Sequence, residues 1–180
     1  EYVGDVLVIS DTPMFDRGVP SICYGLRGLT YCQVDIRGAT SDLHSGSFGG
    51  AVANPAFVLT QLLARMKDRS GRIKIPDFYD DVRPLSDEER VEYARLPFNE
   101  RRFQKELGSR KLFGEKGLPT LERIWARPTF EVNGVYSGFT EDGAKTVIPA
   151  VAMAKVSMRL VPDQNPDLIG DLSVSYTHLT

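Results

Sequence analysis

The amino-acid sequence predicts an α+β fold in which an antiparallel sheet packs against helices. Two segments, 29–37 and 147–161, alternate apolar and polar side chains, as strands with one buried face do. Between them, residues 55–69 carry apolar side chains at helical spacing. The chain has 180 residues, 42% of them hydrophobic and 26% charged. This size and composition are typical of one globular domain with its own core.

A buried strand is expected first, at residues 5–11. Its apolar run ends at polar Ser10 and Asp11, a pattern typical of a strand covered on both faces in an α/β sheet. Such a strand needs neighbouring strands, whereas residues 12–20 offer only a loop. We therefore expect the chain to be an excerpt of a longer protein.

A strand, a loop and a helix are expected next. The strand at 29–37 places Cys32, Val34 and Ile36 on its apolar side, and a Gly/Ser-rich loop at 44–50 follows. Asn54-Pro55 then supplies an N-cap and a first-turn proline for the helix at 55–69.

The rest of the chain predicts an insertion, two strands and a last helix. Residues 76–127 are charged and helix-favouring, and Ser86-Asp87-Glu88-Glu89 has the form of a capping box, which predicts a helical insertion of two or three short helices. Strands at 129–134 and 147–161 follow, and Pro162-Asp163 begins a second helix of the main fold, which includes Asp167, Leu168 and Ile169. This order is that of a ferredoxin-like sandwich without its last strand. The tail, residues 173–180, switches to a β-branched polar pattern and is interpreted as non-native.

Charge and hydropathy exclude two classes of partner. The formal net charge is −2, and no basic stretch is interleaved with aromatic residues, which argues against a nucleic-acid-binding protein. No apolar run is long enough to span a membrane. The two cysteines lack the spacing of a zinc ribbon or a disulfide framework, so reduced thiols in a cytoplasmic protein are expected.

Five short motifs together resemble one enzyme family. They are Val8-Ile9-Ser10-Asp11, Tyr24-Gly25-Leu26-Arg27-Gly28, Asp42-Leu43-His44-Ser45-Gly46-Ser47-Phe48-Gly49-Gly50, Lys145-Thr146-Val147-Ile148-Pro149 and Arg159-Leu160-Val161-Pro162. In this order they resemble the carnosinase and cytosolic nonspecific dipeptidase branch of the co-catalytic zinc exopeptidases. These enzymes are relatives of acetylornithine deacetylase and succinyl-diaminopimelate desuccinylase.

The resemblance implies a division into two domains. Residues 1–27 would form the edge of the catalytic domain, and residues 28–172 would form the lid, which also makes the homodimer. The family's other metal ligands and its paired glutamates have no counterpart in this sequence. The resemblance thus implies a fragment of a metallopeptidase with two zinc ions, and a piece that is inactive alone.

The resemblance also implies roles for Asp11 and His44. Asp11 matches a zinc ligand, although an aspartate before Thr12-Pro13 can also simply cap a turn. His44 matches a histidine that reaches into the partner's active site and stabilises the oxyanion of the tetrahedral intermediate. A histidine in a Gly/Ser loop can equally well be only solvated.

Two further residues match substrate-binding positions. Arg159 lies opposite the apolar face of its strand and matches the group that binds the substrate's terminal carboxylate, for which a bidentate guanidinium is suited. The alternative is a solvated arginine. Thr146 either adds a hydroxyl contact to the same carboxylate or begins the strand.

The leading hypothesis is a zinc-dependent hydrolase of dipeptides or N-acyl amino acids. A second hypothesis is a non-catalytic dimerisation module that pairs through an exposed strand edge or a helix. A third is a ferredoxin-like domain that senses an amino acid bound between protomers.

Overall fold

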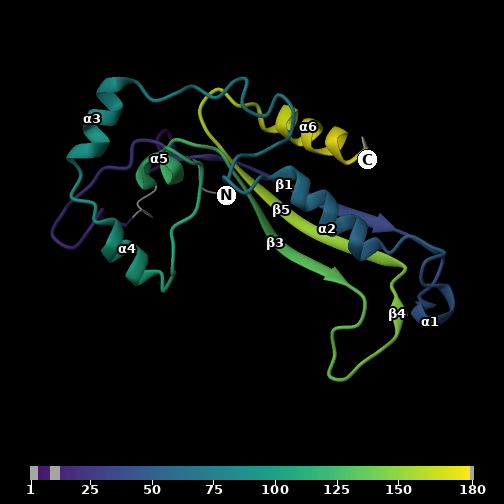
Figure 1. The fold of residues 1–180 in the computed structure, drawn as a ribbon. Coiled ribbons are helices and arrows are strands. Elements are labelled where there is room, and N and C mark those ends of the chain that lie inside the picture. Colours follow the sequence, from purple (N-terminus) through teal and green to yellow (C-terminus); the bar gives the residue numbers. More distant parts are fainter. Residues whose placement is uncertain (1–3, 9–12, 179–180) are drawn as a thin grey trace.

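The core of the molecule is a three-stranded antiparallel sheet. In the computed structural model, which describes residues 4–8 and 13–178, strand β5 (Val151–Leu160) lies between β1 (Gly28–Arg37) and β3 (Thr129–Ser137). Helices α2 (Pro55–Met66) and α6 (Pro166–His178) cover one face of the sheet (Figure 1). This arrangement confirms the predicted α+β class. The strand order β1-β5-β3 is that of a ferredoxin-like sheet without a fourth strand next to β1.

The alternation of side chains places the hydrophobic core under the helices. In β5, Ala152, Ala154, Val156, Met158 and Leu160 are all at most 1% exposed, as the sequence predicted. In β1, the predicted apolar side is half-buried, and the residues between are exposed. The core is completed by buried side chains of α2, α6, β3 and the segment after α2: Leu59, Leu62, Met66, Ile73, Ile75, Phe78, Phe130 and Ile169.

An asparagine side chain caps the start of each main helix, at the predicted place for α2, whereas α6 begins at Pro166 and not at the predicted Pro162-Asp163. Asn54 Oδ1 accepts a hydrogen bond from the Ala56 amide at 2.9 Å, which confirms the predicted N-cap of α2. Asn165 Oδ1 accepts from the Asp167 amide at 2.9 Å and starts α6.

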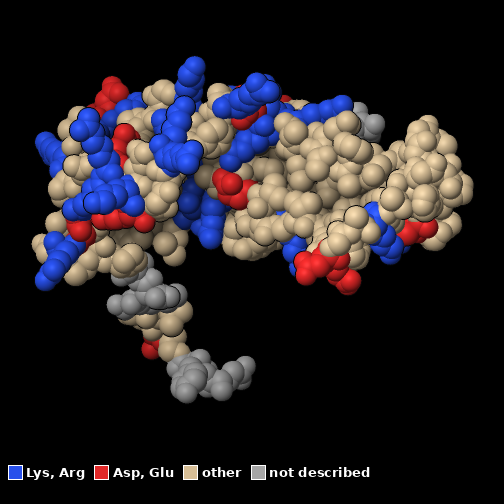
Figure 2. Space-filling model, turned by 60° about the horizontal axis from the view of Figure 1, so that its bottom comes forward, with Lys and Arg blue, Asp and Glu red and all other residues tan. Residues whose placement is uncertain are grey.

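The predicted helical insertion forms three short helices at one end of the sheet. They are α3 (Asp87–Arg95), α4 (Glu100–Glu106) and α5 (Thr120–Trp125). The capping box between Ser86 and Glu89 is present at the start of α3. Figure 2 shows that lysines and arginines gather over this half of the molecule, whereas the opposite end carries few charges.

The end far from the insertion carries a small two-stranded pair. Strand β2 (Leu43–His44) pairs with β4 (Val147–Ile148), and the four-residue helix α1 (Ser45–Phe48) follows β2 (Figure 1). The prediction of one strand over 147–161 is therefore wrong. Pro149 lacks an N–H and the chain breaks there, so residues 147–148 pair with β2 instead of extending β5.

The expected N-terminal strand is absent from the part that the structure describes. Residues 4–8 form no strand, and Val6, Leu7 and Val8 are at least 80% exposed. The described residues offer no neighbouring strand on which this apolar run can pair. Residues 13–19 instead contact the insertion, where the ring of Phe15 packs against Trp125 and Asp16 pairs with Arg102.

Helix α6 continues into the segment interpreted as a non-native tail. It ends at His178, and Ser173 is 4% exposed. The expected domain boundary at residue 172 thus lies inside a helix and not at its end. That residues 173–180 are non-native stays a prediction.

Cys23 and Cys32 are both free thiols. Within the described residues, no helix is long and apolar enough to cross a membrane.

Candidate functional site

The structure brings His44 and Thr146 together on the β2–β4 pair. The two residues are 102 positions apart in the sequence, yet His44 Nε2 lies 3.0 Å from Thr146 Oγ1. The backbone also joins them, because the Ser45 amide donates to the Thr146 carbonyl at 3.1 Å. Both side chains are exposed. Two polar groups at the tip of the molecule are therefore held side by side with access to solvent.

The hydrogen bonds of the imidazole define which nitrogen carries the proton. His44 Nδ1 accepts a hydrogen bond from the Gly46 amide at 3.1 Å. A neutral imidazole that accepts at Nδ1 carries its proton on Nε2. The Nε2–H therefore points to Thr146 Oγ1 and donates to it. This assignment follows from the donor character of a backbone N–H.

Gly46 is required by the close approach of the imidazole. A Cβ atom at this position would lie 2.8 Å from His44 Cε1 and 3.1 Å from Nδ1. The contact with Cε1 is too short and that with Nδ1 is tight, so a side chain here pushes the ring aside. The glycine in His44-Ser45-Gly46 therefore allows the backbone to approach the imidazole ring closely.

Arg159 lies near the other end of β5. It pairs with Leu29 on one side and Thr129 on the other, and its side chain is exposed on the face that the helices leave open. Eight strand residues at ~3.3 Å each put it about 26 Å from Val151 at the start of β5. Thr146 lies before β4, which precedes β5 in the chain. Within one chain, Thr146 therefore contacts His44 and not Arg159.

Arg27 is a second arginine at this end of the sheet. Its Nη1 donates to the Arg127 carbonyl at 3.3 Å. Burial, and to a lesser extent the charge of Arg159, lower the pKa of Arg27. Among the described residues, neither Arg27 nor Arg159 has an ion pair with a carboxylate.

The predicted metal ligand Asp11 lies outside the described residues. Within the part of the chain that the structure describes, no three His, Cys, Asp or Glu side chains are placed to hold a metal ion. These residues do not fit a dinuclear zinc centre by themselves.

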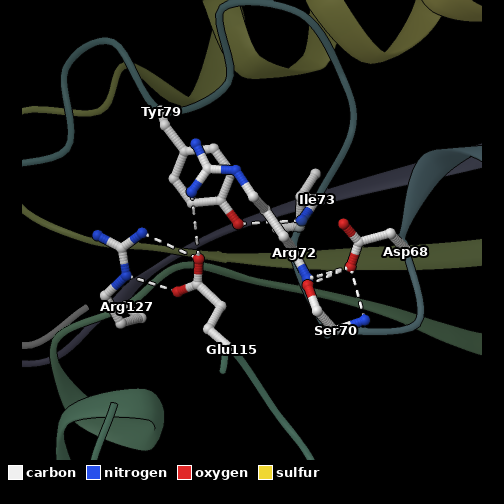
Figure 3. A network of polar contacts seen from close by, with 7 residues as sticks. All are labelled: Asp68, Ser70, Arg72, Ile73, Tyr79, Glu115 and Arg127. Carbon is white, nitrogen blue, oxygen red and sulfur yellow. Dashed lines mark hydrogen bonds and ion pairs between the residues drawn. The ribbon is translucent and has the colours of Figure 1, made fainter. Parts of the chain in front are cut away.

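A polar network away from the His44–Thr146 pair joins the insertion to the sheet (Figure 3). Glu115 accepts two hydrogen bonds from Arg127, at 2.6 Å to Nε and 3.0 Å to Nη2. The guanidinium groups of Arg72 and Arg127 lie 4.3 and 5.0 Å from the ring centre of Tyr79. Burial raises the pKa of Tyr79 to about 12, and its hydroxyl accepts from the Ile73 amide. Every group is paired, so the network is structural.

Comparison with known proteins identifies the fold family. The sequence profile of the peptidase dimerisation domain, M20_dimer, matches residues 24–172. The chain belongs to this family. The match thus covers the sheet, α2, the insertion and the first half of α6.

The curated relatives of this dimerisation domain include metallodipeptidases. The Cys-Gly metallodipeptidase DUG1 of Candida albicans is 37% identical over 98% of this chain, which covers 36% of that protein. The Beta-Ala-His dipeptidase of Homo sapiens is 35% identical over 89% of this chain, which covers 32% of that protein. The chain thus spans about a third of the length of these relatives. The resemblance to the carnosinase-like dipeptidases is confirmed.

Solved structures of M20 enzymes have the same fold. The metallo-carboxypeptidase Sso-CP2 from Sulfolobus solfataricus superimposes with a TM-score of 0.85 at 33% identity, covering 93% of this chain and 44% of that one. The di-peptidase Dug1p from Saccharomyces cerevisiae gives a TM-score of 0.79 at 36% identity, covering 87% and 33%. Both confirm the predicted lid architecture.

Sequence reasoning identified His44, Thr146 and Arg159 but missed the contact between His44 and Thr146, and it placed Thr146 beside Arg159, from which it lies apart within one chain. It also missed Arg27 and Asp42 as neighbours of these groups. Both residues lie inside two of the five motifs, and membership in a motif was the one sequence feature that could have identified them. Contacts across more than a hundred residues leave no local pattern.

Proposed function

We propose that this chain is the lid and dimerisation segment of a metallopeptidase with two zinc ions that hydrolyses dipeptides or N-acyl amino acids. The dimerisation-domain match and the names of the metallodipeptidase relatives support the class. In this proposal Asp11 is one metal ligand, the remaining ligands belong to the rest of the parent, and the enzyme is cytoplasmic. The chain alone would be inactive.

The observation that carries the proposal is the exposed His44–Thr146 contact. On substrate binding the Nε2–H of His44 would turn from Thr146 Oγ1 to a developing oxyanion, and the Thr146 hydroxyl, 3.0 Å away, would be a second donor. Arg159 would bind the terminal carboxylate through its planar guanidinium. Because β5 separates the pair from Arg159, one substrate would meet His44 and Thr146 of one protomer and Arg159 of its partner.

A mixed-dimer experiment tests this arrangement in the parent enzyme. The His44→Ala and Asp11→Ala variants should each be inactive, whereas a one-to-one mixture that exchanges subunits should recover about a quarter of wild-type activity. Half of its dimers are mixed, and each has one site with both residues intact. Recovery should fail for His44→Ala mixed with a His44→Ala/Asp11→Ala double variant. Absence of activity in the first mixture would show that His44 does not act across the dimer.

Self-association of the chain itself is the second candidate function. By register, Val132 and Val135 of edge strand β3 lie on the helix-covered face, yet they are 44% and 55% exposed. Phe57 and Val58 at the start of α2 are 68% and 39% exposed. Exposed apolar side chains on an unpaired edge strand and a neighbouring helix are typical of a pairing surface.

Sedimentation equilibrium of the Val135→Lys variant tests this surface. We expect the wild-type chain to dimerise and the charge at the strand edge to weaken the dimer at least ~tenfold. Val91→Lys on α3, where Val91 is 50% exposed, is the matched control and should leave association unchanged. A wild-type chain that stays monomeric at high concentration would rule out pairing by this segment alone. Thermal stabilisation by an added amino acid would instead favour the sensor hypothesis.

A further inference from the structure

Asp42 connects the two segments that carry His44 and Thr146. It lies two residues before His44, and its Oδ1 accepts a hydrogen bond from the Ala150 amide at 2.8 Å. Ala150 follows Pro149 in the break between β4 and β5. An aspartate in a loop usually bonds to the backbone two residues further on. Asp42 instead bonds to a group 108 residues away, so its hydrogen bond is tertiary.

The β2–β4 pair is too short to fix its own geometry. It contains only two residues in each strand, with Leu43 opposite Ile148 and His44 opposite Val147. On one side of the pair, the Ser45 amide bonds to Thr146. On the other side, Ala150 is bonded twice, because its carbonyl accepts from the Gly38 amide at 2.8 Å and its amide donates to Asp42. Asp42 is therefore the side chain that links the segment before β2 to the segment between β4 and β5.

We propose that Asp42 is a positioning residue that holds His44 Nε2 at hydrogen-bond distance from Thr146 Oγ1. The functional consequence rests on the proposed function, in which these two groups contact the substrate. A hydrogen bond to a carboxylate is about twice as strong as one between neutral groups. Without it, the Ala150 amide loses its partner, and the loop that carries His44 can move relative to β4.

The structure offers conservative and matched variants. Asp42→Asn keeps an acceptor oxygen in the same place, whereas Asp42→Ala removes it. Asp35→Ala is the control, because Asp35 is an exposed aspartate of β1 whose carboxylate, among the described residues, accepts only from the Gln33 side chain. Gly46→Ala is the positive reference, since its Cβ displaces the His44 ring directly.

Nitrogen-15 NMR of the imidazole in the full chain tests the proposal. Spectra are recorded at about pH 8.5, where an ordinary imidazole is neutral, and His178→Gln assigns the two histidines. In the wild type the Nε2–H tautomer should dominate, with slow exchange of that proton. Asp42→Ala should speed this exchange at least ~tenfold, as Gly46→Ala does, while Asp42→Asn restores most of the protection. Unchanged backbone amide signals from β5 show that the sheet stays folded.

The results separate the positioning role from the proposed function. If Asp42→Ala leaves the exchange of the Nε2–H as slow as in Asp35→Ala, Asp42 does not position His44. In the parent enzyme, Asp42→Ala should lower kcat about tenfold with little change in KM, and Asp42→Asn should recover most of it. Faster exchange together with an unchanged kcat would confirm the positioning role and count against the catalytic role of the His44–Thr146 pair.

Discussion

Replacing Glu115 with alanine should lower the free energy of unfolding of the chain by about 3–5 kcal/mol. The Glu115 side chain is 11% exposed and that of Arg127 is 17% exposed. The bidentate pair between them raises the pKa of Arg127. Removing the carboxylate leaves a mostly buried guanidinium without a counter-charge, and this desolvation cost exceeds the value of the pair itself.

The expected loss is large because Glu115 joins the insertion to the sheet. Glu115 lies in the loop before α5, whereas Arg127 lies two residues before the start of β3, and Tyr79 at the start of the insertion stacks on Arg127. Urea denaturation followed by circular dichroism measures the effect. Glu131→Ala is the control, since Glu131 pairs with Lys67 at 60% exposure and should contribute at most about 1 kcal/mol. Equal losses for both variants would contradict the prediction.

A double variant separates the pair from its desolvation cost. Glu115→Ala combined with Arg127→Met removes both charges, so no uncompensated cation remains. The double variant should regain most of the stability that Glu115→Ala loses. If it is less stable than the single variant, the packing of Arg127 on Tyr79 is the larger contribution.

The sequence predicted those parts of the fold whose signal is local. The period-two alternation of β1 and β5 identified their buried faces, because a strand with one covered side must alternate. The N-cap at Asn54 and the capping box at Ser86 are likewise formed within a few residues. Each of these features is determined by neighbours in the sequence, and each was found.

The features that sequence reasoning missed are determined by distant partners. The apolar run at residues 6–8 would form a strand only if it paired with other strands, and the described residues contain no strand beside it. The break at Pro149 is visible in the sequence, but the partner of residues 147–148 is β2, about a hundred residues earlier. The same reason hid the candidate site, where the His44–Thr146 and Asp42–Ala150 contacts each span more than a hundred residues.

Gly71→Ala should also destabilise the chain strongly, by about 2–5 kcal/mol. Gly71 has φ +85°, a left-handed conformation that costs an L-residue about 1–2 kcal/mol. A Cβ here would also lie 2.6 Å from the carbonyl carbon and 2.8 Å from the carbonyl oxygen of Gly114. These are backbone atoms, which cannot turn aside as the end of a flexible side chain can, and such overpacking adds about 1–3 kcal/mol.

Gly50→Ala isolates the conformational part of this cost. Gly50 has the same φ of +85°, but no atom of the described part of the chain lies within 4 Å of the position of its Cβ. It should therefore lose only about 1–2 kcal/mol in the same urea titration. If Gly71→Ala loses no more than Gly50→Ala, the contact with Gly114 is not tight in solution.

The clash at Gly71 should act through Glu115. A Cβ atom at position 71 would lie 3.0 Å from the Glu115 amide nitrogen. The loop segment that must move to relieve the clash is therefore the one that holds the Glu115 carboxylate against Arg127. A shift of this loop weakens the same ion pair that Glu115→Ala removes. The stability losses of Gly71→Ala and Glu115→Ala should therefore not add, and the double variant should be less destabilised than their sum by at least ~1 kcal/mol. Strict additivity would mean that Gly71 and the ion pair stabilise the insertion independently.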